Sequence, residues 1–201
     1  FDPQGALSAG FGTNPHELDV TVYNVLMDRK TDILDAIITT DVQNVDLLPA
    51  NIDLSAAEVQ LVNEVAREQV LERALRSVTD DYDIVLIDCQ PSLGLLTVNA
   101  LTAAHGVIIP LTAEFFALRA VALLVETIEK VQDRLNPALS IDGVLATMYD
   151  PRTLHGREVV GRLVEAFGDT VFETVIRRTI KFADANVAAE PITTYAANHP
   201  G

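Results

Sequence analysis

The 201-residue sequence contains no tryptophan and only one cysteine, and aromatic residues make up 5% of it. A single cysteine, Cys89, excludes a disulfide framework and is typical of proteins from the reducing cytoplasm. It also argues against an iron–sulfur centre, which needs several cysteine ligands. The four histidines lack the spacing of metal ligands, so we expect solvated or packing roles for them: His16, His105, His155 and His199.

Positive charge is also scarce, because 14 lysine and arginine residues stand against 29 aspartate and glutamate residues and leave a formal net charge of −15. Non-specific DNA binding depends on cations that contact phosphates, so any such binding by this chain is expected to be weak and salt-sensitive. The negative total does not exclude a local basic face, because salt screens charges beyond about 8–10 Å.

Two further features are missing. No glycine-rich loop ends in Gly-Lys-Ser or Gly-Lys-Thr, the usual cradle for nucleotide phosphates, since none of Lys30, Lys130 and Lys181 follows a glycine. The uncharged stretch 89–113 is long enough to cross a bilayer, but it contains prolines and glycines and divides into a helix pattern and a short strand. We expect a buried helix–strand pair there.

Alternating helix and strand patterns fill the rest of the chain, with alanine, valine, leucine and isoleucine as core residues. This alternation predicts one α/β domain over residues 1–201, with a mostly parallel sheet flanked by helices. Strands are expected at 45–48, 84–87, 107–109, 141–148 and 171–176. Helices are expected at 5–11, 20–27, 33–38, 55–78, 92–104, 116–134 and 159–167, with Glu58 in a capping box at the start of the fourth and Ser92 as the cap of the fifth.

The apolar run 84–87 is typical of a strand buried on both faces, and it ends at Asp88. A carboxylate at the carboxyl end of a parallel strand lies where open α/β folds bind ligands. Asp88 can therefore hold Mg²⁺, usually through water, beside nucleotide phosphates. The alternative is an ordinary aspartate at the end of a strand.

A second acidic motif opens the chain as Asp2-Pro3-Gln4-Gly5. By itself Asp2 could merely cap the helix that follows, because Asp-Pro is a good helix start. Read with residues 48–54, 88–97 and 147–150, however, the motif resembles the ParA/MinD group of deviant P-loop ATPases, and most closely its ParA/Soj branch. The run 88–97 departs from the family pattern only at Gln90, where the family has proline.

The resemblance implies a role for each motif. Asp2 would lie near the γ-phosphate and orient or activate the attacking water, and Asp88 would be the Walker B carboxylate. Met148 and Arg177 would lie at the nucleotide site, where Arg177 replaces a proline that helps to wall the adenine pocket. Because the phosphate loop is absent, the chain is interpreted as a P-loop NTPase domain without its first βα unit, and it is expected to be inactive alone.

The resemblance also implies a function. Arg152, Arg178 and Lys181 match basic residues that the ParA/Soj branch uses on DNA, although they could form a solvated charged turn. The intact protein would be a cytoplasmic, nucleoid-associated ATPase for chromosome or plasmid partitioning. With ATP and Mg²⁺ it would form a homodimer that binds DNA without sequence preference, and a ParB-like protein would stimulate hydrolysis and release. The alternatives are a MinD-like ATPase that binds membranes through a C-terminal amphipathic helix and a non-catalytic scaffold.

Overall fold

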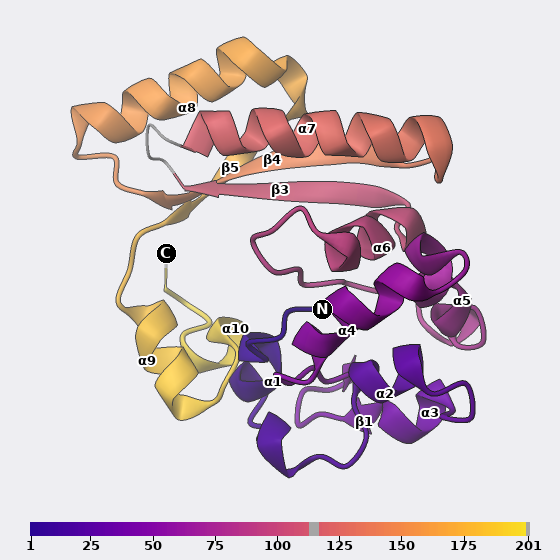
Figure 1. Cartoon of the computed structure of the whole chain (residues 1–201). Coiled ribbons are helices and arrows are strands. Elements are labelled where there is room, and N and C mark those ends of the chain that lie inside the picture. Colours follow the sequence, from indigo (N-terminus) through magenta and orange to yellow (C-terminus); the bar gives the residue numbers. More distant parts are fainter. Residues whose placement is uncertain (113–116, 200–201) are drawn as a thin grey trace.

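The computed structural model describes residues 1–112 and 117–199, and its most regular part is a parallel sheet of three strands (Figure 1). The strands are β3 (Gly106–Thr112), β4 (Ser140–Tyr149) and β5 (Val171–Arg177), paired in that order. Helices α7 (Ala117–Arg134) and α8 (Leu154–Phe167) lie on one side of the sheet, and α6 (Leu95–Ala103) lies on the other. This arrangement confirms the predicted fold class.

The sheet and its helices enclose one of two hydrophobic cores. Val144 and Ala146 of β4 are fully buried there beside Ile128 of α7 and Leu163 of α8, and Leu101 of α6 joins them. Apolar side chains recur on both faces of these strands, which is what a parallel sheet covered by helices requires. The expected pair of elements in 89–113 is present as α6 and β3.

The first half of the chain is built mainly from short helices around a second core, which includes Val22, Leu54, Leu61, Leu71 and Leu96. Its elements are α1 (Ala6–Gly10), α2 (Val22–Met27), α3 (Ile33–Ala36), β1 (Ile38–Thr39), β2 (Asp46–Leu47), α4 (Leu54–Gln60) and α5 (Val70–Leu75). Short 3₁₀ turns lie at Pro15–Glu17, Leu61–Asn63, Arg67–Gln69, Thr79–Asp81 and Gly168–Thr170. The chain continues beyond the sheet with α9 (Lys181–Ala188) and α10 (Ile192–Tyr195).

Three expected elements differ in this half. The strand expected at 45–48 is the short β2, which pairs antiparallel with β1, and β1 takes the end of the helix expected at 33–38. The long helix expected at 55–78 is interrupted, because α4 ends at Gln60 and Ala66 adopts a left-handed backbone with φ 54°. The apolar spacing is nevertheless correct, since Leu61 and Leu71 are both buried across the break.

The prediction of a buried strand at 84–87 was wrong. The segment pairs with no strand among the described residues, and Ile84 and Leu86 are 75% and 84% exposed. Of this run, Ile87 packs against the second core. An apolar β-branched run favours extended backbone, but only hydrogen bonds to a neighbouring strand make it part of a sheet. Within the described residues, no helix combines the length and apolar character needed to cross a bilayer.

Candidate functional site

Asp2 and Asp88 lie on the same small cavity although 86 positions separate them in the sequence. The cavity is also lined by Gly5, Leu48 and Ala50. Asp2 does not cap α1, whose N-cap is Gly5; instead, its Oδ1 accepts the N–H of Gln4 at 2.9 Å and closes the turn before the helix. Its Oδ2 and the whole Asp88 carboxylate accept no hydrogen bond from the described residues. Three carboxylate oxygens therefore remain available at this cavity.

Gly5 explains how the first motif comes so close to the rest of the site. Its backbone is left-handed with φ +62°, and a Cβ at this position would lie 2.7 Å from the carbonyl oxygen of Ala50. Any other residue would push the turn that carries Asp2 away from the chain after β2. A hydrogen bond between the Ser8 hydroxyl and the Ala50 N–H, at 3.2 Å, holds the same two segments together.

The pKa of the Cys89 thiol is shifted by its surroundings near this cavity. Loss of water around the sulfur raises the pKa of the Cys89 thiol, the N-terminal ammonium of Phe1 lowers it, and the smaller effects of Asp88 and Asp2 raise it. The residue keeps part of its surface exposed, but the raised pKa keeps its thiol protonated at neutral pH and makes it a poor nucleophile.

The loop after Asp88 is anchored at its far end by a residue from another helix. Both carboxylate oxygens of Glu58, on α4, accept backbone N–H groups of α6: Leu95 at 2.5 Å and Leu96 at 3.1 Å. Glu58 therefore caps α6 instead of forming the expected box at the start of α4. Ser92, the expected cap of α6, accepts the N–H of Gly94 and receives a 2.6 Å hydrogen bond from Thr97 at its carbonyl oxygen.

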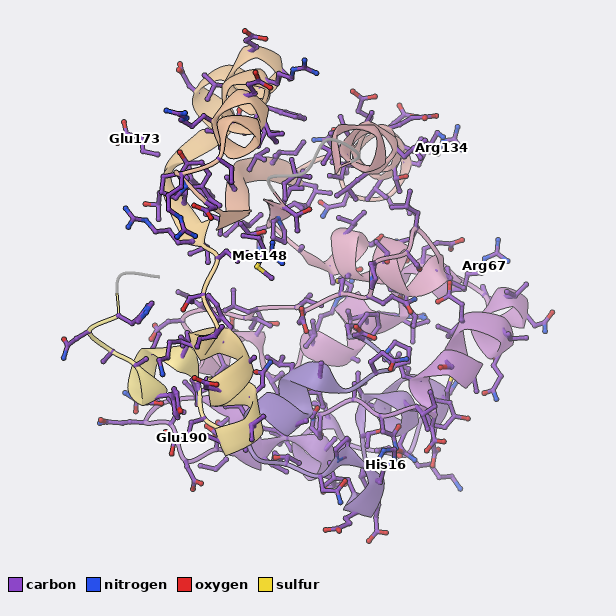
Figure 2. The ribbon with its side chains drawn as sticks, turned by 90° about the vertical axis from the view of Figure 1, so that its left-hand side faces the viewer. His16, Arg67, Arg134, Met148, Glu173 and Glu190 are labelled. Atoms are coloured by element: carbon purple, nitrogen blue, oxygen red, sulfur yellow. The ribbon has the colours of Figure 1, made fainter. Side chains whose placement is uncertain are left out.

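Met148 and Arg177 lie at the ends of neighbouring strands. Arg177 ends β5 and is the register partner of Tyr149, the last residue of β4. Met148 has a left-handed backbone with φ 54° and a side chain that is half exposed, and Figure 2 shows this side chain between the sheet and the helices below it. A non-glycine residue in this conformation is uncommon, and such strain clusters at ligand sites. No sequence pattern predicts this backbone conformation.

The residues present fit a magnesium–nucleotide site only in part. Carboxylate oxygens are the ligands that Mg²⁺ prefers, and the ion usually keeps several waters and takes further oxygens from phosphates. No group of three or more histidine, cysteine, aspartate or glutamate residues could hold a metal within the part of the chain that the structure describes. Asp2 and Asp88 can therefore contribute to holding Mg²⁺, but they do not form a complete cage for it.

The three predicted DNA-binding cations lie at and just beyond the ends of β4 and β5. Arg152 forms an ion pair with Asp150 at 2.8 Å, and Lys181 forms one with Asp184 at 3.1 Å. The Arg178 backbone N–H donates to the carbonyl oxygen of Tyr149 at 3.0 Å, which ties the two strand ends together. Hydrogen bonds from Arg152, with a smaller contribution from the charge of Arg178, lower the pKa of Asp150 to about 2.

Comparison with known proteins decides the family. A sequence profile described as an AAA domain matches residues 1–141. The chromosome-partitioning ATPase Soj of Treponema pallidum is 47% identical over 201 residues, which cover 100% of this chain and 78% of that protein. The chain belongs to the ParA/Soj branch of the ParA/MinD family. The resemblance drawn from its motifs is confirmed.

Two other similar proteins show how far the likeness extends. An uncharacterised protein of Mycobacterium tuberculosis strain H37Rv is 62% identical over 201 residues, and this chain spans 63% of that relative's length. The structure of cobyrinic acid a,c-diamide synthase from Mycobacterium smegmatis with bound ADP and magnesium is 42% identical, with a TM-score of 0.83 over 94% of this chain and 75% of that one. The second likeness confirms the α/β fold of this ParA-type chain.

Proposed function

We propose that the intact protein, meaning the product of its gene, is an ATP-dependent partitioning ATPase that uses Asp2 and Asp88 at one magnesium–nucleotide site. The observation that carries this proposal is the position of both carboxylates on one cavity, each with oxygens that no described residue engages. Membership of the ParA/Soj branch supports the reaction class. The ADP and magnesium in the M. smegmatis structure support the choice of cofactor.

The two carboxylates are proposed to have different roles in ATP hydrolysis. Bound ATP and Mg²⁺ supply the phosphoryl group for transfer to water and the positive charge that stabilises it. Asp88 would hold water ligands of the ion. Asp2 would orient the attacking water through Oδ2, because its Oδ1 already accepts the N–H of Gln4. The loop 90–94 joins Asp88 to α6 and would carry the nucleotide state to the rest of the fold.

The adenine base of the nucleotide and the DNA would bind to other parts of the protein. Met148 and Arg177 are proposed to contact the nucleotide, because strand ends of open α/β sheets bind ligands and Met148 has a strained backbone there. Arg152, Arg178 and Lys181 are proposed to contact DNA phosphates without base preference. The ATP-bound state would be a homodimer on the nucleoid in the cytoplasm, and a ParB-like protein would stimulate hydrolysis and release.

Substitutions of the two aspartates in the intact protein test the division of roles. Asp88→Ala is expected to weaken magnesium-dependent ATP binding, because the ion loses an anchor for its waters. Asp2→Ala is expected to leave ATP binding nearly intact but to abolish turnover and to trap the ATP-bound dimer. Nucleotide titration, steady-state turnover and size measurement would check these outcomes.

Asp83→Ala is the matched control, since Asp83 is an exposed aspartate on the same extended segment. It is expected to bind and hydrolyse ATP like the wild type. Equal loss of ATP binding in the Asp2 and Asp88 variants would contradict the proposed roles. Wild-type protein without ATP turnover would favour the scaffold alternative, and ATP-dependent binding to lipid vesicles without DNA binding would favour the MinD-like one.

A further inference from the structure

Two of the three candidate DNA-binding cations are already paired with carboxylates of the same chain. Arg152 pairs with Asp150, and Lys181 pairs with Asp184. Arg178 forms no ion pair within the described residues. Much of the positive charge that DNA phosphates would contact is therefore neutralised locally, in addition to the negative charge of the whole chain.

The pair of Arg152 and Asp150 has the geometry of a specific interaction. The Asp150 Oδ1 accepts the Arg152 Nε–H at 3.0 Å, and its Oδ2 accepts from Nη2 at 2.8 Å. This side-on fork is the same geometry in which arginine binds a phosphate. The Arg152 side chain is 87% exposed, whereas that of Asp150 is only 25% exposed, so the carboxylate is the better fixed partner.

The local backbone explains why Asp150 stays in place. Its Oδ1 also accepts the backbone N–H of Arg152 at 3.0 Å, and its carbonyl oxygen accepts the Thr153 hydroxyl at 2.9 Å. The Thr153 hydroxyl in turn caps α8 by accepting the N–H of Gly156 at 3.1 Å. The turn between β4 and α8 therefore presents the carboxylate to Arg152 independently of any ligand.

We propose that Asp150 is an internal competitor that holds the DNA-binding edge of Arg152 and thereby limits affinity for nucleic-acid phosphates. The inference rests on the proposed function, because it concerns the same DNA face. A phosphate that uses the Nε and Nη2 edge of Arg152 must displace a carboxylate already bound there. Until it does so, the pair carries no net charge and releases no counterion when DNA approaches.

The Asp184–Lys181 pair is a weaker version of the same arrangement. It joins one lysine nitrogen to one carboxylate oxygen within the first turn of α9, and the Lys181 nitrogen also lies 5.9 Å from the centre of the Tyr195 ring. A lysine makes single contacts and rotates freely, so a phosphate can bind it beside the carboxylate. The competition is therefore expected to be stronger at Arg152.

Asp150→Asn in the intact protein tests the proposal. Asparagine keeps an oxygen for the Arg152 backbone N–H but lacks the negative charge. With ATP and Mg²⁺ present, the affinity for a duplex oligonucleotide is expected to rise by roughly two- to fivefold, the upper part of the range for one surface ion pair. The slope of log affinity against log salt should steepen by about one unit. Two unrelated duplex sequences should show the same gain.

Two further variants make the result specific. Glu126→Gln changes the total charge equally and releases Lys130 from a 2.7 Å ion pair on α7, a helix that carries none of the three proposed DNA-binding cations. It should alter DNA affinity by less than about twofold, because Lys130 is not one of the proposed phosphate contacts. In an Arg152→Ala background, Asp150→Asn should give no gain in affinity.

The outcomes separate this inference from the proposed function. Wild-type protein that binds DNA while Asp150→Asn binds equally or more weakly would overturn the inference alone. A gain that persists without Arg152 would also overturn it. If neither protein binds DNA at low salt, both fail. If Asp150→Asn alone binds, and only with Arg152 present, the inference is supported.

Discussion

The runs 84–87 and 141–148 were both expected to be strands, but they have opposite surroundings in the structure. Residues 141–148 lie within β4, which pairs with β3 and β5, and Val144 and Ala146 are fully buried. The run 84–87 has no partner strand among the described residues, and Ile84, Val85 and Leu86 are exposed. The comparison shows that an apolar run gains stability from its neighbours, because its composition alone supplies neither hydrogen bonds nor burial.

Truncation of Leu86 and of Leu163, which packs in the same core as β4, gives the largest contrast. In the 201-residue chain, Leu163→Ala is expected to lower the free energy of unfolding by about 2–5 kcal/mol, because it leaves a cavity in the sheet core. Leu86→Ala should change it by less than about 0.5 kcal/mol, since the side chain is mostly exposed. Urea unfolding of both variants checks the difference. A loss of about 2 kcal/mol or more for Leu86→Ala would mean that this side chain is buried in solution.

A smaller effect is expected where the exposed segment rejoins the fold. Glu58→Ala should lower the free energy of unfolding by about 1–2 kcal/mol, because it removes the carboxylate that caps α6 and leaves the N–H groups of Leu95 and Leu96 without an acceptor. Val59→Ala is the control, since Val59 is the neighbour of Glu58 on α4 and its side chain is exposed. Circular dichroism during urea titration provides the measurement. If the two variants lose the same amount, Glu58 does not anchor the loop.

The sequence predicted elements well where local pattern and surroundings agree. The strands β3, β4 and β5 and the helices α6, α7 and α8 form within or near the expected ranges, because each buries its apolar face against the next. The break at Ala66 escaped prediction, since alanine favours helices and nothing in its residue type signals a left-handed backbone. The cap supplied by Glu58 also escaped, because α4 and α6 are distant in sequence.

The candidate site was also predictable only in part, because some of its features depend on how the chain folds locally. Family motifs identified Asp2 and Asp88, and the structure places both on one cavity. The left-handed backbone of Met148 has no sequence signature. The pairing of Arg152 with Asp150 depends on the turn after β4, so residue types two positions apart did not reveal it. The sequence therefore indicated the charged residues of the candidate site, but not which of them are already paired with carboxylates.

We propose that the nucleotide state at Asp2 and Asp88 controls DNA binding at the ends of β4 and β5. The most direct test is the affinity of the intact protein for duplex DNA at low salt, measured with Mg²⁺ and either ATP or ADP. We expect binding that is at least about tenfold tighter with ATP, a coupling within the usual range for linked sites. Equal affinity in both nucleotide states, or no binding in either, would contradict it.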